Sequence, residues 1–339
     1  MADATTFQQA TGSPWFLTAG DEATMQRYLR QLGFLRPRET VRNVSSAGEG
    51  NMNVTLRVFT NRRHFIVKQS RPWVAKFPDL TAPVERILVE RDFLRHTQQR
   101  PATARASPQI RKADGENFVL IIEDLGQAAD LTTLYAAGVQ LADSELTTLL
   151  EYAGTLHRLE VEPDYPRNRG LRELNHAHIF ELPFRADNGF PLDALHPGLA
   201  RVAQPLREDE RLARRARELG ALYLADNSDT LIHGDFYPGS FLRVSGRLYV
   251  IDGEFSHRGR PEFDLGVLLG HLLLAGAPER QLHLLDTAYR RPPGFDGGLV
   301  RQFAYVEVIR RIIGIAQLPL AISLDERQAL LESARAGLL

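Results

Sequence analysis

Alternating apolar and polar positions predict several β-strands in the first part of the chain. Residues 51–59 (NMNVTLRVF) alternate in this way, and residues 64–69 (HFIVKQ) form a β-branched run that carries one lysine. Residues 117–122 (NFVLII) have the continuous apolar character of a buried strand. Between these runs, apolar positions at helical spacing predict a helix over residues 84–94. We therefore expect a sheet accompanied by one helix.

Helical spacing dominates the remainder of the chain. It predicts helices over residues 144–159 and 207–225, whereas residues 160–200 are rich in Pro, Asn, Asp and His and lack a clear period. We expect this middle stretch to be an irregular connection. Two short strand-like runs, residues 230–232 and 248–251, are separated by a segment that contains Pro and Gly. The second part is thus predicted to be mainly helical.

The order of these elements predicts an α+β protein with two lobes. A small β-rich N-terminal lobe would span residues 1–125, and a larger helical C-terminal lobe would span residues 126–339. A chain of 339 residues is long enough for about two domains, in agreement with this division. Hydrophobic residues at 43% and charged residues at 24% are typical of a globular protein rather than a disordered one.

Composition excludes several classes of function. The 41 basic and 42 acidic residues give a formal net charge of −1, which argues against general nucleic-acid binding. The chain has no cysteine, so disulfides, thiolate metal sites and cysteine nucleophiles are excluded. The N-terminus lacks the pattern of a secretory signal, and the most apolar stretch, residues 265–275, is too short to span a bilayer. We therefore expect a cytoplasmic protein without a membrane or nucleic-acid partner.

The densest group of chemically active residues lies between positions 231 and 264. Asp235 follows one short apolar run, and Asp252 and Glu254 follow the next. Carboxylates at the ends of buried strands need partners. Two acids separated by one glycine could bind a hard cation such as Mg²⁺, and Asp235 could orient or deprotonate an acceptor hydroxyl. Each acid alone could instead be a turn residue capped by backbone amides, but the ordered set favours a catalytic interpretation.

The first lobe contains matching candidates for phosphate binding. A Gly/Asn turn over residues 47–53 would let backbone N–H groups approach phosphate oxygens, although many such turns only close hairpins. Lys68 lies in an apolar strand, where a cation needs an acidic partner or an anionic ligand, and Glu90 is a candidate partner. The alternative is a lysine at a strand edge that faces water. The turn residues assigned to nucleotide binding are Gly48, Gly50, Asn51 and Asn53.

This set of segments resembles the protein-kinase-like small-molecule phosphotransferases, the superfamily of aminoglycoside phosphotransferases and choline kinases. Within that superfamily it is similar to the methylthioribose kinase family. The resemblance extends from residue 48 to about residue 316, which is most of the chain. The segments that carry it are GEGNMN (48–53), VKQ (67–69), GS (239–240), DGEF (252–255), FDLG (263–266) and RRIIG (310–314).

The resemblance implies a bilobal protein-kinase-like fold and an ATP- and Mg²⁺-dependent activity. The γ-phosphoryl group of ATP would pass to a hydroxyl of a small sugar-like metabolite, such as methylthioribose or another 5-modified pentose. Lys68 would contact the ATP phosphates and pair with Glu90, and the 48–53 loop would cover the phosphates. Residues 122–125, including Glu123 and Leu125, would form the hinge that reads adenine through backbone groups.

The resemblance also implies roles for residues of the second lobe. Asp235 would be the catalytic base or orienter, and Ser240 would end the catalytic loop near the nucleotide. Asp252 and Glu254 would bind Mg²⁺. The remaining catalytic residues, Arg310 and Arg311, would stabilise the transferring phosphoryl group or hold the sugar. The alternative for this pair is a solvated helix face with a salt bridge to Glu307. Methylthioribose kinases are often dimers, which makes a homodimer compatible with the resemblance.

Two departures from the family pattern leave the acceptor open. Residues 236–238 read Phe-Tyr-Pro where the family has Leu-His-Thr, and Gly253 replaces a proline. One alternative function is that of an aminoglycoside or amino-sugar phosphotransferase, but the many arginines in residues 131–225 do not suit a polycation. The other alternative is a nucleotide-binding pseudokinase that acts as a scaffold. The presence of Lys68, Asp235 and the paired acids in one chain disfavours it.

Overall fold

The structure is a computed structural model that describes residues 3–48 and 52–339. The chain divides into two compact units. The first comprises the described residues up to Gln127 together with Asp252–Phe255, and the second comprises Ala128–Ile251 and Ser256–Leu339. The acidic segment Asp252–Phe255 therefore packs with the first unit, although the sequence of the second unit surrounds it.

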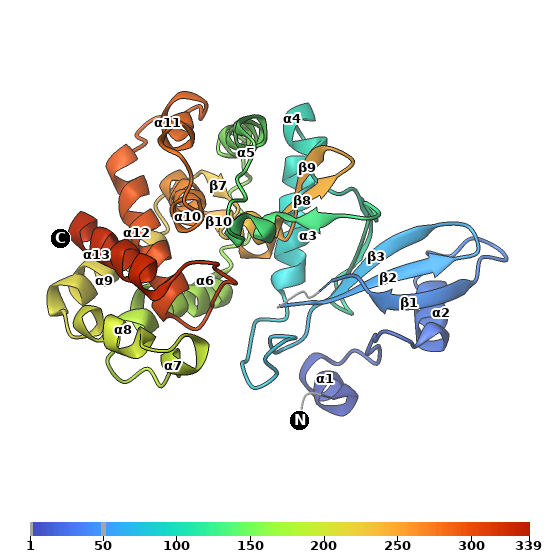
Figure 1. The fold of residues 1–339 in the computed structure, drawn as a ribbon. Helices are drawn as coiled ribbons and strands as arrows, with labels where there is room; N and C mark the ends of the chain where they lie inside the picture. The colour runs from blue at the N-terminus through green and yellow to red at the C-terminus, as the bar shows by residue number, and fades with distance from the viewer. Residues whose placement is uncertain (1–2, 49–51) are drawn as a thin grey trace. The chain divides into compact units, whose positions relative to one another are not determined.

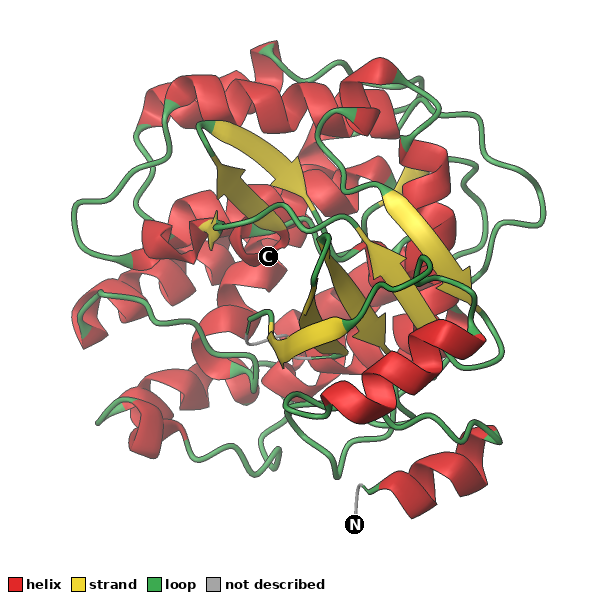
Figure 2. Ribbon diagram, turned by 90° about the vertical axis from the view of Figure 1, so that its right-hand side faces the viewer, coloured by secondary structure: helices red, strands yellow, loops and turns green. Residues whose placement is uncertain are grey.

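A five-stranded antiparallel sheet with the order β1-β2-β3-β5-β4 forms the first unit (Figures 1 and 2). The strands are β1 (Val41–Ser46), β2 (Val54–Thr60), β3 (His64–Gln69), β4 (Ile110–Asp114) and β5 (Val119–Ile122). Lys68 lies in the central strand β3, where it is in register with Thr55 of β2 and Leu120 of β5. The alternative of a lysine at a water-facing sheet edge is therefore wrong.

The two faces of this sheet pack against different helices. Val67 packs in a core cluster with Met25 and Leu29 of α2. Because side chains alternate along a strand, Lys68 points to the opposite face. On that face α3 contacts β4 and β5. The helices of the first unit are α1 (Ala4–Thr11), α2 (Glu22–Gln31), α3 (Arg86–Thr97) and α4 (Pro101–Ala104).

The second unit consists mainly of helices, which are labelled in Figure 1. The α-helices are α5 (Asp143–Leu156), α6 (Arg169–His176), α7 (Leu192–Leu195), α8 (Leu199–Arg207), α9 (Glu210–Leu224), α10 (Pro261–Leu274), α11 (Glu279–Thr287), α12 (Gly297–Ile313) and α13 (Leu324–Leu338). One small sheet has the order β6-β8-β9 (Ala129–Asp130, Phe241–Val244, Arg247–Val250), and another pairs β7 (Leu231–Ile232) with β10 (His257–Arg258). Short turns of other helix types are η1 (Leu131–Tyr135), η2 (Ala177–Glu181), η3 (Leu182–Phe184), η4 (Pro238–Ser240) and, in the first unit, η5 (Gly253–Phe255).

Helices α10 and α12 make the most extensive helix pair of the second unit (Figure 1). Two glycines one turn apart on α10 allow this close approach. A Cβ at Gly266 would lie 2.4 Å from Cβ of Phe303, and a Cβ at Gly270 would lie 2.8 Å from Cβ of Glu307. Glycine leaves room for the facing backbone, although it costs about 1 kcal/mol in helix propensity. The packing places Glu307 inside the helix pair.

The predicted α+β class is confirmed, and the strand prediction for residues 64–69 agrees with β3. The prediction of an irregular connection over residues 160–200 is wrong, because this stretch contains α6, η2, η3 and α7 and the first residues of α8. These elements are too short to produce a recognisable period, and tertiary burial of residues such as Phe180 and Leu199 stabilises them. Among the helices of residues 3–48 and 52–339, none has the length and apolar composition that crossing a membrane requires.

Candidate active site

In the first unit, Lys68 is the centre of a buried group that we call the lysine cluster: Lys68, Glu90, Asp252, Glu254, Arg86 and Asn53. Lys68 is 5% exposed and Glu90 of α3 is 1% exposed. The Lys68 ammonium donates to Glu90 Oε1 at 2.6 Å and also pairs with Asp252. Burial opposes the charged lysine, but Asp252 and Glu90 raise its pKa above the ordinary value. The cation is therefore held charged at a defined place.

The acidic segment has a backbone that only certain residues tolerate. Asp252 adopts a left-handed conformation with φ of 61°. At Gly253, an added Cβ would lie 2.1 Å from Cδ1 of Phe93 on α3. A proline or any larger residue would collide with that ring in its present position. The side chain of Asp252 is 43% exposed, so it remains accessible beyond its contact with Lys68.

Glu254 is held differently from Asp252. Its Oε2 accepts a hydrogen bond from Asn53 Nδ2 at 2.8 Å and lies 3.3 Å from Nε of Arg86. Burial raises the pKa of Glu254 to about 8, although Arg86 opposes this shift. Asn53 Oδ1 is buried and has no hydrogen-bond partner among residues 3–48 and 52–339. These contacts connect the acidic segment to Asn53, the last residue of the Gly/Asn turn, and to α3.

Arg86 is a site residue that the sequence reasoning missed. It is fully buried and donates to the carbonyl oxygens of Met52 (2.6 Å), Arg71 (2.7 Å) and Pro83 (2.7 Å). The available signal was its helical spacing, because Arg86 lies one turn before Glu90 on the same face of the helix predicted over residues 84–94. Arg86 thus anchors three loop segments around the lysine cluster.

Gly48 is described by the structure and accepts a hydrogen bond from Ser46 Oγ at 2.9 Å. Gly50 and Asn51 lie outside the described residues.

The predicted hinge follows β5. The Glu123 amide donates to Gln109 O at 2.8 Å, and Glu123 Oε2 accepts from the Gln109 amide at 3.2 Å. Arg57 of β2 pairs with Asp124 at 2.9 Å, which orders the segment beside Leu125. The hinge is thus fixed at both ends, and its role in reading adenine stays a prediction.

In the second unit, Asp235 is the centre of the arginine cluster, which we define as Asp235, Arg310, Arg311, Glu307, His271 and Tyr135. The terminal nitrogens of Arg310 and Arg311 each lie 3.9 Å from Asp235 Oδ1. The side chain of Asp235 is 25% exposed. Burial raises the pKa of Asp235 above its ordinary value, although Arg311 and Arg310 oppose that shift. The cluster holds an accessible carboxylate beside two fixed cations.

The two arginines are buried rather than solvated. Both guanidinium groups donate through Nε to the Glu307 carboxylate, at 2.5 Å for Arg310 and 2.8 Å for Arg311. The alternative interpretation of a solvated helix face includes this salt bridge to Glu307. The Arg311 guanidinium also lies over the ring of Tyr237, 4.9 Å from its centroid. The alternative of a solvated helix face is therefore wrong, while the salt bridges it invoked are present.

Asp264 of α10 fixes the loop that carries Asp235. It accepts hydrogen bonds from the amides of His233 (2.7 Å) and Gly234 (2.9 Å) and from His157 Nε2 (3.1 Å). Burial opposes ionisation of Asp264, but the His157 hydrogen bond holds its pKa below the usual range. Ser240 Oγ donates to the Asp235 carbonyl at 2.8 Å. Asp264 and Ser240 therefore position the loop that carries Asp235 from opposite ends.

A ready-made metal site is absent from the described parts of the chain, since no group of three or more His, Asp or Glu residues is suitably arranged there. Mg²⁺ does not require such a group, because it is typically bound by one or two carboxylates together with water and phosphate oxygens. The accessible carboxylate of Asp252 and the neighbouring Glu254 fit that requirement.

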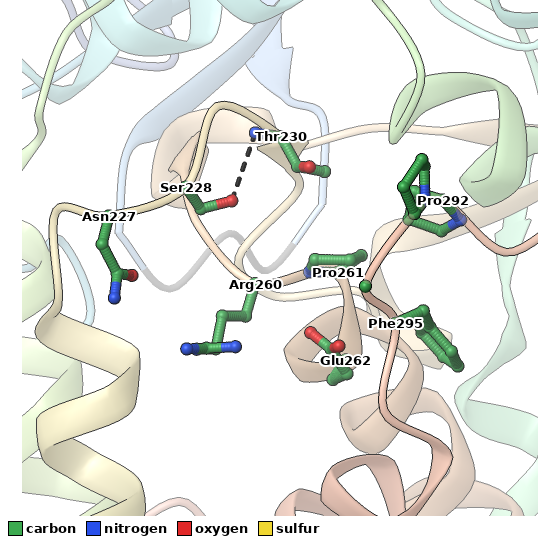
Figure 3. A pocket seen from close by; sticks show the side chains of 10 residues that line it. Asn227, Ser228, Thr230, Arg260, Pro261, Glu262, Pro292 and Phe295 are labelled. Atoms are coloured by element: carbon green, nitrogen blue, oxygen red, sulfur yellow. Dashed lines mark hydrogen bonds between the residues drawn. The ribbon is translucent and has the colours of Figure 1, made fainter.

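A small pocket of about 120 Å³ in the second unit contains none of the predicted site residues (Figure 3). Arg260 and Glu262 at the start of α10 line it together with Phe295. Glu262 instead serves the packing of two helices, because its Oε1 accepts from the amide of Asp296, the N-terminal capping residue of α12, at 2.8 Å.

The chain is similar in sequence to two kinases of known name. The chain is 29% identical over 264 residues to a methylthioribose kinase of Erwinia tasmaniensis, an alignment that covers 73% of this chain and 64% of that protein. It is 27% identical over 245 residues to a methylthioribose kinase of Exiguobacterium sibiricum, covering 68% of this chain and 61% of that protein. The chain thus spans less than two thirds of the length of these two relatives.

Solved structures show the same fold. A Plasmodium vivax ethanolamine kinase superposes with a TM-score of 0.56 at 12% identity, covering 98% of this chain and 92% of that one. A microcompartment-associated aminopropanol kinase gives a TM-score of 0.52 at 16% identity, covering 93% of this chain and 95% of that one. Residues 56–301 match the profile of the family described as Phosphotransferase enzyme family, and because this match covers most of the chain, the protein belongs to that family.

Proposed function

We propose that this protein is an ATP-dependent kinase that phosphorylates a hydroxyl group of a small sugar-like metabolite. Methylthioribose or a related 5-modified pentose is the first candidate acceptor. The observation that carries the proposal is the arginine cluster, in which an accessible carboxylate, Asp235, lies 3.9 Å from two buried guanidinium groups. Phosphoryl transfer needs positioning and charge stabilisation more than covalent chemistry, and this cluster supplies both.

The first unit is proposed to bind the nucleotide. Lys68, held charged by Glu90 and Asp252, would donate to phosphate oxygens. The backbone around Gly48 and Asn53 would cover the phosphates, and Glu123 and Leu125 would read the base. Asp252 and Glu254 would hold Mg²⁺, which neutralises phosphate charge when bound. Ion pairing keeps Lys68 and Asp252 in place before the nucleotide arrives.

Asp235 is proposed to accept the hydrogen bond of the acceptor hydroxyl and to take its proton. The raised pKa of this carboxylate, which follows from burial, makes it a better base than an exposed aspartate. Ser240 and Asp264 fix the loop on which Asp235 lies. The orientation of the hydroxyl would therefore depend on a rigid backbone rather than on a mobile side chain.

Arg310 and Arg311 are proposed to stabilise the negative charge of the transferring phosphoryl group or to hold the sugar. A guanidinium is a planar fork of donors that suits phosphate oxygens. The same cations oppose a polycationic acceptor beside Asp235, because like charges repel at short range. This favours a neutral sugar over an aminoglycoside, and it separates the proposal from the amino-sugar alternative.

The pseudokinase alternative predicts nucleotide binding without turnover. We propose a catalytic protein instead, because a scaffold has no need for an accessible Asp235 beside two buried arginines. We further propose that the protein acts in the cytoplasm on small molecules rather than on nucleic acids. A homodimer is a separate prediction, which light scattering of the purified protein would test.

A coupled ADP-release assay tests the proposed function. Methylthioribose, related pentoses, nucleosides and aminoglycosides would be supplied in turn with Mg²⁺ and ATP. We expect acceptor-dependent ADP release with a 5-modified pentose, slow release without an acceptor, and none with Asp235→Asn. Equal rates with and without every acceptor would contradict the proposal, and a preference for aminoglycosides would favour the alternative.

A further inference from the structure

We propose that Glu307 is a positioning residue that holds Arg310 and Arg311 away from direct pairing with Asp235. The proposal rests on the proposed function for its kinetic consequences, but the geometry it describes is a property of the second unit alone. Glu307 lies on α12, one turn before both arginines, and it is only 1% exposed.

The carboxylate of Glu307 accepts a hydrogen bond from the Nε–H group of each arginine, with a different oxygen for each. Its Oε2 accepts from Nε of Arg310 at 2.5 Å, and its Oε1 accepts from Nε of Arg311 at 2.8 Å. The Nε–H of each guanidinium is therefore occupied by Glu307, and Arg311 Nη1 donates to the Ala316 carbonyl at 3.4 Å. The Nη2 atoms of Arg310 and Arg311 each lie 3.9 Å from Asp235 Oδ1, which is beyond hydrogen-bond distance. Asp235 thus keeps an oxygen available, and the arginines keep donors available.

A second set of contacts holds Glu307 itself. His271 Nε2 lies 2.9 Å from Glu307 Oε1, and His271 Nδ1 lies 2.6 Å from the hydroxyl of Tyr135. Burial lowers the pKa of His271 to about 4, so the ring is neutral at neutral pH. An ionised carboxylate only accepts hydrogen bonds, so Nε2 must carry the proton and Nδ1 must accept from Tyr135. With the proton on Nε2, His271 donates to Glu307 and accepts from Tyr135, and this pair of hydrogen bonds holds the Glu307 carboxylate in place.

The backbone of α10 leaves room for this arrangement. A Cβ at Gly270 would lie 2.8 Å from Cβ and 2.9 Å from Cγ of Glu307. Burial alone would raise the pKa of Glu307, but Arg310 and Arg311 hold it well below the usual range. Glu307 is therefore ionised and immobile, and its charge offsets one of the two guanidinium charges.

Without Glu307, the nearest remaining carboxylate for both arginines is Asp235. A buried charge left without its partner is strongly unfavourable, so the guanidinium groups are expected to close onto Asp235. That closure would occupy the oxygen that receives the acceptor proton. It would also withdraw the terminal nitrogens from the phosphoryl group. The loss should therefore fall on kcat rather than on the KM for ATP.

Glu307→Gln and Glu307→Asp test the proposal together. Glu307→Gln removes the charge, whereas Glu307→Asp keeps the charge but shortens the side chain by one methylene group. We expect both variants to lose on the order of 10²-fold in kcat, with an ATP KM close to that of the wild type. The matched control is Glu39→Gln, because Glu39 is a fully buried carboxylate paired with Arg63 at 2.9 Å in the first unit. Its kcat should be unchanged.

The pH dependence of kcat/KM, read together with kcat, separates positioning from a simple charge effect. The charged groups that act on Asp235 are Arg311, Arg310, Glu307 and His233, and the titratable hydroxyls of Tyr135 and Tyr223 also interact with its charge. In Glu307→Gln, closer arginines and the lost negative charge both lower the pKa of Asp235, so the acidic limb moves to lower pH. A shifted limb with wild-type kcat in Glu307→Gln, or wild-type kcat in Glu307→Asp, would overturn the proposal.

A spectroscopic readout keeps the inference independent of enzymatic activity. In ¹H–¹⁵N spectra of the full-length protein, the Nε–H groups of Arg310 and Arg311 should give two signals protected from solvent exchange. Arg310→Lys and Arg311→Lys would assign them. Both signals should shift and lose protection in Glu307→Gln and remain in Glu39→Gln. Unprotected signals in the wild type would refute the geometry, even if the kinase activity is present.

Discussion

Replacing His271 with glutamine should remove part of the acid sensitivity of the folded protein. His271 is fully buried, and its pKa is lowered to about 4 by burial. The unfolded chain binds a proton at this imidazole below about pH 6.5, whereas the folded protein does not until about pH 4. Between these values the unfolded state holds the extra proton, so stability falls as the pH falls.

The size of this effect follows from the two pKa values. Each pKa unit corresponds to about 1.4 kcal/mol, so His271 alone should lower the free energy of unfolding by about 2 kcal/mol between about pH 7 and about pH 5. Urea unfolding at these pH values would measure the loss in the wild type, in His271→Gln and in His283→Gln. His283 is exposed and serves as the matched control.

We expect His271→Gln to lose less stability on acidification than the wild type by about 2 kcal/mol, because glutamine has no proton to gain. His283→Gln should follow the wild type. Glutamine can still donate to Glu307 and accept from Tyr135, so the variant is expected to fold. Parallel pH dependences of the wild type and His271→Gln would refute a neutral, buried imidazole between Glu307 and Tyr135.

Four further predictions concern the two clusters. Lys68→Ala should weaken productive ATP binding, which the KM for ATP would report, because a charge-assisted phosphate contact is lost. Asp252→Asn should lower turnover strongly and raise the Mg²⁺ concentration that the residual activity requires, because an amide is a poorer ligand for a hard cation, and a Mg²⁺ titration of the rate would test this. Arg310→Ala and Arg311→Ala should each lower kcat by on the order of 10²- to 10³-fold in proteins that melt normally, and lysine should not restore it fully. Gly253→Ala should destabilise the protein by about 1–3 kcal/mol in urea unfolding, because the new Cβ would lie 2.1 Å from the Phe93 ring, and unchanged stability would contradict that contact.

The alternation of side chains made part of the site predictable. An apolar run with one lysine indicates a buried strand, and a buried lysine requires an acidic partner, so the pair of Lys68 and Glu90 follows from local patterns. The structure brings these residues to 2.6 Å. The acidic segment 252–255 was also visible, because its carboxylates follow a short strand directly.

Other parts of the site depend on contacts that no local pattern reveals. Asp264 accepts hydrogen bonds from the backbone amides of His233 and Gly234, which lie about 30 positions earlier in the chain. Glu307 was visible only as a salt-bridge partner, and its burial depends on Gly270 of a different helix. Arg86 donates to carbonyl oxygens of the Gly/Asn turn and of the loop that precedes its helix, and no local pattern brings those two segments together. Such residues become recognisable only when tertiary packing is known.

Product identification by ³¹P NMR tests the central claim most directly. The protein would be incubated with ATP, Mg²⁺ and methylthioribose, with Asp235→Asn in parallel. Transfer to a sugar hydroxyl predicts a new phosphomonoester signal that grows with the ADP signals and shows coupling to a sugar proton, and no such signal with the variant. Growth of inorganic phosphate alone, or a phosphomonoester formed equally by Asp235→Asn, would contradict phosphoryl transfer at the arginine cluster.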